Sequence, residues 1–139
     1  MSKIAVVYWS GTGNTEAMAN AVVEGAQGKG AEVELIQCSD FTAGDISRFD
    51  AFAFGCPSMG AEALEETEFE PMFSSVEDSL SGEKVGLFGS WGWGNGAWMV
   101  DWEDRCRAKG MDLAGSVTCC EAPDEVALAE CRDLGESLA

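Results

Sequence analysis

Short apolar segments alternate with longer amphipathic segments along almost the whole chain. Residues 4–9 form an unbroken apolar run, which is typical of a β-strand buried on both faces. Apolar or alternating segments predict further strands at 33–38, 50–55, 84–90 and 113–119, and the last has the weakest pattern. The sequence therefore contains five candidate strands.

The amphipathic segments between these strands have apolar residues at helical spacing. They predict helices over 14–28, around 71–80, over 96–109, and at the C-terminus after the start signal Pro123–Asp124. The positions that define these helices are Met18, Ala21, Val22, Gly25, Ala26, Trp98, Trp102, Cys106, Ala127, Cys131, Leu134 and Leu138.

The alternation of strands and helices predicts the fold class. Strands that alternate with helices are joined by right-handed crossovers, so we expect an α/β protein with a parallel sheet covered on both faces. The chain has 139 residues and shows no repeat or linker. We therefore expect a single domain, residues 1–139.

The net charge says more about the partners of the protein than its overall composition does. The chain has 8 basic and 25 acidic residues, which give a net charge of −17. Such a surface repels nucleic acid and anionic membranes and favours partners with basic docking surfaces. From Asp50 to Glu83 there are nine carboxylates and no Lys or Arg. The chain contains no histidine, which excludes a Ser-His-Asp triad, histidine-ligated metals and imidazole acid–base chemistry.

The cysteines and the apolar segments bear on the cellular compartment. The six cysteines show no C-x-x-C spacing, so an iron–sulfur or zinc site has little support and no metal is expected. A polar loop interrupts the N-terminal apolar run too early for a secretory signal, and no segment approaches the ~20 apolar residues of a membrane span. We expect a soluble, cytoplasmic protein whose cysteines are mostly buried, idle thiols.

A polar loop separates the first predicted strand from the first helix. It consists of Ser10, Gly11, Thr12, Gly13, Asn14 and Thr15. Its free N–H groups, its neutral side chains and the positive end of the following helix suit a phosphate. The loop lacks the G-x-x-x-x-G-K-[ST] motif and any basic residue, so a monophosphate ester fits better than a nucleoside triphosphate. The alternative is a loop that only caps the helix.

Two further loops follow strands that end at the same edge of the sheet, residues 57–66 and 90–96. The second loop sets Trp91 and Trp93 among glycines, which favours a planar ligand that stacks on them. Gly92, Gly94 and Ala97 also match G-x-G-x-x-A. That match is weak because Trp93 occupies the place where the backbone would approach a pyrophosphate.

These motifs resemble those of short-chain flavodoxins from anaerobic bacteria. The resemblance covers nearly the full length and rests on "YWSGTGNTE" (8–16), "GCPSMG" (55–60), "FEP" (69–71), "GLFGSWGWGNGAWM" (86–99) and "PDE" (123–125). It implies a flavodoxin-like three-layer sandwich with a five-stranded parallel sheet in the order 2-1-3-4-5. It also implies one non-covalently bound FMN.

The resemblance implies roles for particular residues. The loop 10–15 and Ser90 would bind the 5′-phosphate. Met59 and Trp93 would cover the two faces of the flavin ring, Glu62 would accept a hydrogen bond from N3–H, and the Gly60 carbonyl would face N5 after reduction. The full set expected to bind FMN is Ser10, Gly11, Thr12, Gly13, Asn14, Thr15, Ser58, Met59, Gly60, Ala61, Glu62, Ser90, Trp91, Gly92, Trp93, Gly94, Cys119, Cys120 and Glu121.

The sequence departs from the family pattern at a few of these positions. Pro57 stands where a relative can have a phosphate-contacting hydroxyl. Trp91 replaces a more usual Tyr, and Ala61 replaces a more usual Asp, Asn or Ser. The contacts of the 119–121 loop are assigned only loosely by the resemblance.

The resemblance implies a monomeric, low-potential one-electron carrier between redox proteins. The alternative is an FMN-dependent quinone or nitro reductase of the same fold. The chain has no residues to spare for a nicotinamide site, which favours the carrier. A phosphorylated receiver domain would need an acidic cluster after the first strand, where Trp9 and Ser10 stand instead.

Overall fold

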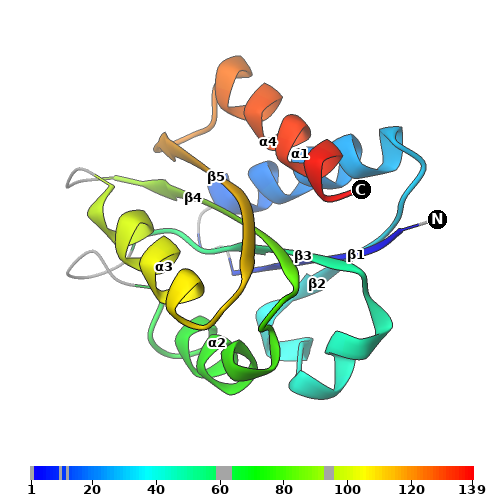
Figure 1. Ribbon diagram of the computed structural model, residues 1–139. Helices are drawn as coiled ribbons and strands as arrows, with labels where there is room; N and C mark the ends of the chain where they lie inside the picture. The colour runs from blue at the N-terminus through cyan, green and yellow to red at the C-terminus, as the bar shows by residue number, and fades with distance from the viewer. Residues whose placement is uncertain (1, 10, 12, 59–63, 93–95) are drawn as a thin grey trace.

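The computed structural model describes residues 2–9, 11, 13–58, 64–92 and 96–139, and its centre is a parallel sheet (Figure 1). Five strands pair in the order β2-β1-β3-β4-β5, as the resemblance predicted. Their bounds are β1 Lys3–Tyr8, β2 Glu32–Gln37, β3 Ala51–Gly55, β4 Lys84–Trp91 and β5 Asp112–Cys120. Every pairing is parallel, and a register shift between Val85 and Gly86 interrupts the β4–β5 ladder.

Helices cover both faces of the sheet and complete the three layers. Helices α1 and α4 lie on one face, and α2 and α3 on the other (Figure 1). The helices are α1 Asn14–Gly28, α2 Phe69–Val76, α3 Ala97–Ala108 and α4 Glu125–Leu138, with 3-10 turns at η1 Cys38–Asp40, η2 Ala43–Arg48 and η3 Glu77–Ser79. The predicted three-layer α/β sandwich is confirmed.

Alternation along the central strands sends side chains into two separate cores. In β3, Phe52 and Phe54 pack toward α2 and α3, whereas Ala51 and Ala53 pack toward α1 and α4. All five residues of β3 are buried, which explains why the strand reads as an unbroken apolar run. The predicted apolar positions of α1, α3 and α4 are buried as well.

Helices α1 and α4 pack so closely that glycines are required at their contact. A Cβ on Gly25 of α1 would lie 1.9 Å from the carbonyl oxygen of Arg132 in α4. A Cβ on Gly135 of α4 would lie 2.1 Å from the carbonyl oxygen of Val22. Any larger residue at Gly25 or Gly135 must push the two helices apart.

An arginine joins the two helices on the other face. The Arg105 guanidinium donates two hydrogen bonds of 2.7 Å to the carboxylate of Glu70, and bonds of 2.9 and 2.8 Å to that of Glu77. It also lies 5.0 Å from the centre of the Phe73 ring. These contacts fix α3 against α2, so the segments that lead into both helices have a common support.

Most element boundaries differ from the sequence predictions by one residue, and those of α2 and β5 have a clear physical reason. Helix α2 begins at Phe69 instead of Pro71, because Phe69 is fully buried and the side chain of Glu65 caps the helix from upstream. Pro71 is the third helical residue, where no N–H is needed. Strand β5 has the weakest apolar pattern and is nevertheless nine residues long, because its pairing with β4 continues to Cys120.

The helices and the cysteines bear on the cellular compartment of the protein. Within the described residues, no helix is long and apolar enough to cross a membrane. All six cysteines are described, and all are free. Cys38, Cys56, Cys106 and Cys131 are buried, as predicted for most of them.

Candidate functional site

A cavity of about 300 Å³ lies where the carboxyl ends of β1, β3 and β4 meet. This edge of a doubly wound sheet is where ligands bind, because the chain leaves the central strands in opposite directions there. The described residues that line the cavity are Trp9, Gly11, Asn14, Pro57, Ser58, Ser90, Trp91, Gly92 and Glu121. They come from four loops that are far apart in the sequence.

The first of these loops leads into α1. Gly13 is the N-cap of the helix and has a φ of 93°, a left-handed conformation that glycine adopts without strain. Gly11 and Asn14 line the cavity, and the next residue, Thr15, is buried. The start of α1 therefore borders the cavity and supplies partial positive charge there. Ser10 and Thr12 lie outside the described residues.

The ends of β3 and β4 form the second part of the wall. The N–H of Ser58 donates a 2.9 Å hydrogen bond to the carbonyl of Ser90, so the two loops are held together beyond the last paired residues. The Ser90 side chain is buried and lines the cavity. The structure thus brings Ser58 and Ser90 together with Asn14 at this cavity.

Cys56 and Glu65, which flank the loop after β3, are joined by a hydrogen bond. The N–H of Glu65 donates to the Cys56 sulfur at 3.3 Å. The Glu65 carboxylate, 6% exposed, accepts hydrogen bonds from the N–H groups of Thr67, Glu68 and Phe69 and from the Thr67 hydroxyl. Burial alone would raise the pKa of Glu65, but these bonds outweigh it and lower the pKa to about 2.

The predicted contacts to the flavin ring fall on segments outside the described residues. They are Met59, Gly60, Ala61 and Glu62 in the loop after β3, and Trp93 and Gly94 in the loop after β4. Trp91 and Gly92, at the start of the latter loop, line the cavity. The half-buried Trp91 also packs against the core beneath α2 and α3.

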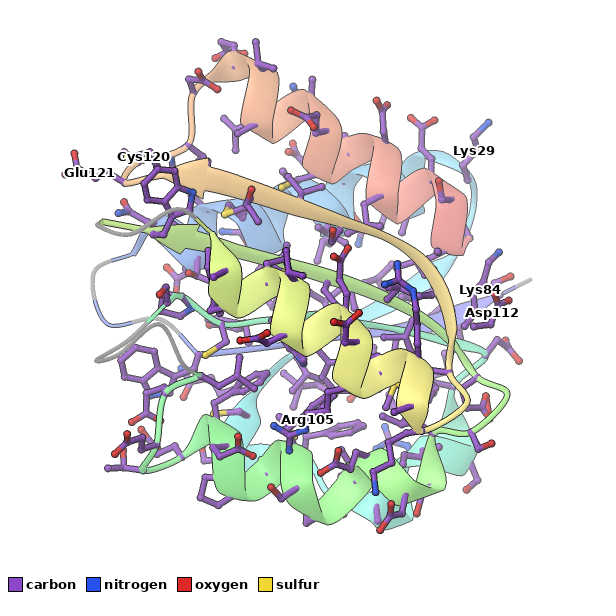
Figure 2. The ribbon with its side chains drawn as sticks, turned by 60° about the vertical axis from the view of Figure 1, so that its left-hand side comes forward. Lys29, Lys84, Arg105, Asp112, Cys120 and Glu121 are labelled. Carbon is purple, nitrogen blue, oxygen red and sulfur yellow. The ribbon has the colours of Figure 1, made fainter. Side chains whose placement is uncertain are left out.

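The end of β5 contributes Glu121 to the cavity wall. Its N–H donates a 2.7 Å hydrogen bond to the carbonyl of Trp91, and its φ is 59°. The described lining does not include Cys119 or Cys120. The Cys119 sulfur lies 3.6 Å from that of Met18 in α1, and burial raises its pKa to about 11. Cys120 is exposed beside Glu121 at the same end of the molecule (Figure 2).

The described lining suits an anion that is held by neutral groups. It contains hydroxyl, amide and backbone donors beside a helix N-terminus, and it contains no Lys or Arg. Its single carboxylate is Glu121, which directly follows β5. Two indoles give the cavity an aromatic surface. This donor set fits a phosphate ester joined to a less polar group.

Sequence reasoning missed Trp9 as a lining residue and Pro57 as more than a departure from the family pattern. Trp9 directly follows β1, and Pro57 comes two residues after the end of β3, both at the ligand-binding edge. That position was the available signal, because residues at the carboxyl ends of central strands face the loops. Trp9 was instead assigned to the first strand, which ends at Tyr8.

Comparison with known proteins finds relatives along nearly the whole chain. Residues 6–135 match the model of the family described as flavodoxin. The flavodoxin of Megasphaera elsdenii is 44% identical over 136 residues, 98% of each chain, and that of Clostridium beijerinckii is 40% identical over 134 residues, 96% of this chain and 97% of the relative. The solution structure of two-electron reduced Megasphaera elsdenii flavodoxin matches with a TM-score of 0.91, at 44% identity, over 97% of both chains.

Proposed function

We propose, from the premise that this chain belongs to the flavodoxin family, that the cavity holds the phosphate end of an FMN molecule. Members of the family are FMN-binding electron carriers. The chain accordingly binds FMN and carries electrons between redox proteins, and it is not an enzyme that reduces small quinone or nitro substrates. When bound, FMN supplies the redox chemistry, because its ring accepts and releases electrons.

The proposed phosphate site consists of the loop 10–15 and Ser90. The observation that carries it is the start of α1 at a cavity lined by neutral donors, since these can bind a dianion without a basic side chain. Asn14 and the backbone around Gly11 and Gly13 would donate to the phosphate oxygens. Ser10, Thr12 and Thr15 complete the set on the strength of the resemblance.

We assign the flavin ring to the two loops beyond this cavity. Met59 and Trp93 would cover its two faces, Glu62 would accept from N3–H, and the Gly60 carbonyl would face N5. The flavin ring and the ribityl chain of FMN would be bordered by Ser58, Ala61, Trp91, Gly92 and Gly94. The 119–121 segment would flank the ring. The anchoring of Glu65 and the position of Trp91 beside the cavity support this placement.

The phosphate assignment can be tested by comparing two flavins that differ only in the phosphate. Asn14→Ala should weaken the binding of FMN about tenfold or more, because a hydrogen bond to a charged group is lost, and should leave riboflavin binding nearly unchanged. Fluorescence titration of each flavin measures both constants. The matched control is Asn20→Ala, on an exposed position of the same helix. Equal losses for both flavins would remove the assignment.

We further propose that basic partners dock at the cofactor end. Apart from Arg132, every Lys and Arg stands at the amino-terminal edge of the sheet or at the end of a helix: Lys3, Lys29, Arg48, Lys84, Arg105, Arg107 and Lys109. Lys29 and Lys84 lie at the opposite end of the molecule from Glu121 (Figure 2). Acidic groups therefore dominate the cofactor end, where they attract a positively charged surface.

We also propose that residues 1–139 act as one domain, as a monomer in the cytoplasm. All five strands belong to one sheet, which supports the single domain. The six free thiols are typical of a reducing compartment. Sedimentation equilibrium should give the mass of one 14.7 kDa chain plus FMN. A mass near twice that value would contradict the monomer.

A further inference from the structure

Trp9 stands between the main cavity and a second, smaller one. It directly follows β1, and it is among the residues that line both the cavity of about 300 Å³ and a polar cavity of about 120 Å³. The smaller cavity is also lined by Glu16, Gln37 and Glu68. The indole is therefore a partition that separates the proposed phosphate site from the polar pocket behind it.

The indole also supports the loop that is proposed to bind phosphate. A Cβ on Gly11 would lie 3.0 Å from the ring carbon Cη2 of Trp9, so the loop backbone lies directly against the ring. The main chain of Trp9 is fixed by its N–H, which donates to the carbonyl of Gly55 at 3.0 Å. This backbone hydrogen bond does not fix the orientation of the indole ring, which forms the surface against which Gly11 lies.

Trp9 packs against the core beneath α2 and α3, and one long-range hydrogen bond further constrains the orientation of its ring. The indole N–H of Trp9 donates to the Glu68 carboxylate at 2.9 Å, across 59 residues of sequence. Glu68 is itself held at the start of α2, because its N–H donates to Glu65 at 2.7 Å and its carbonyl accepts from Met72 at 3.2 Å. The position of Glu68 is thus determined by the anchored end of the loop after β3.

We propose that Glu68 is a positioning residue that holds the Trp9 indole against the loop 10–15 and thereby tightens the binding of the flavin phosphate. This inference rests on the proposed phosphate site and adds a residue that does not touch the ligand. Glu68 acts through the ring, and the ring acts through the loop backbone at Gly11. The same contacts join the loop after β1 to the segment that ends the loop after β3.

Glu68 has two effects on phosphate binding, and they have opposite signs. Its negative charge repels a dianion, whereas its hydrogen bond to Trp9 organises the site that binds the dianion. Glu68→Gln removes the charge and keeps an oxygen that can accept from the indole. Glu68→Ala removes both. Glu66, an exposed carboxylate two residues earlier, provides matched variants that change the charge alone.

The test compares FMN and riboflavin binding in Glu68→Ala, Glu68→Gln, Glu66→Ala and Glu66→Gln by fluorescence titration. We expect Glu68→Ala to bind FMN about three- to tenfold more weakly than Glu66→Ala, with no such difference for riboflavin. Glu68→Gln should bind FMN at least as tightly as the native protein. Equal FMN affinities for Glu68→Ala and Glu66→Ala would overturn the proposal.

Trp9→Phe supplies a second route to the same answer, because it removes the donor and keeps an aromatic ring. The loss of FMN affinity in Trp9→Phe and in Glu68→Ala should not add in the double variant. Additive losses would contradict the proposal. If Asn14→Ala weakens FMN alone and Glu68→Ala equals Glu66→Ala, only the role of Glu68 fails. If Asn14→Ala weakens both flavins equally, the phosphate site fails as well.

Discussion

At the scale of single residues, Glu65 is a buried carboxylate whose four donors all belong to the segment that begins α2. Its pKa is lowered from 4.5 to about 2, so it stabilises the folded state at any pH above 4.5. That contribution, about 3 kcal/mol by linkage, is lost as the pH falls from 4.5 toward 2.

We therefore expect Glu65→Gln to lower the free energy of unfolding by about 2–3 kcal/mol at pH 7. The gap between the native protein and the variant should shrink as the pH falls below 4.5. Urea unfolding at a constant FMN concentration, at several pH values, measures it. Glu66→Gln is the control because Glu66 is exposed. A gap that stays constant down to pH 2 would contradict the assigned pKa.

Sequence reasoning treated Glu65, Glu66 and Glu68 as members of one acidic run, and the structure gives them three different positions. Glu65 is buried and caps a helix, Glu68 bonds to a distant indole, and Glu66 faces solvent. Spacing within the run cannot separate them, because the Trp9 contact crosses 59 residues and the cap depends on where α2 begins. The run itself, and its lack of basic residues, were visible in the sequence.

At the scale of the elements, the contact between α1 and α4 provides a sharp test of packing. Gly25→Ala should lower the free energy of unfolding by about 2 kcal/mol or more, because its Cβ would meet the Arg132 carbonyl at 1.9 Å. Gly28→Ala, three residues later in the same helix, meets nothing within 4 Å and should raise it by about 0.5–1 kcal/mol. Thermal unfolding compares the two variants, and equal responses would contradict the packing.

Most elements could be predicted from periodicity, but the start of α2 and the order of the strands could not. The strands buried on both faces and the helices α1, α3 and α4 carry their patterns locally. Helix α2 begins earlier than predicted because its cap is supplied from Glu65. The order of the five strands came from family resemblance, since periodicity does not say which strands pair.

At the scale of the whole molecule, the uneven distribution of charge predicts how partners approach. Glu121→Gln, at the cofactor end, should slow electron transfer with a small basic redox protein about twofold at low ionic strength and hardly at all in 1 M salt. The control is Asp112→Asn, an equal change of charge at the opposite end (Figure 2). Stopped-flow rates at several salt concentrations measure both. Equal slowing by the two variants would indicate that net charge alone, and not its placement, guides the encounter.

Cys120 provides a native site for chemical labelling at the cofactor end of the molecule. Four of the six thiols are buried and Cys119 is half-buried with a raised pKa, whereas Cys120 is exposed. Alkylating reagents attack accessible thiolates, so in the folded protein they are directed to Cys120. A fluorescent dye or spin label attached there stands one residue from the cavity wall, without an engineered cysteine. A label on Cys120 can thus detect the binding of redox partners to the native chain.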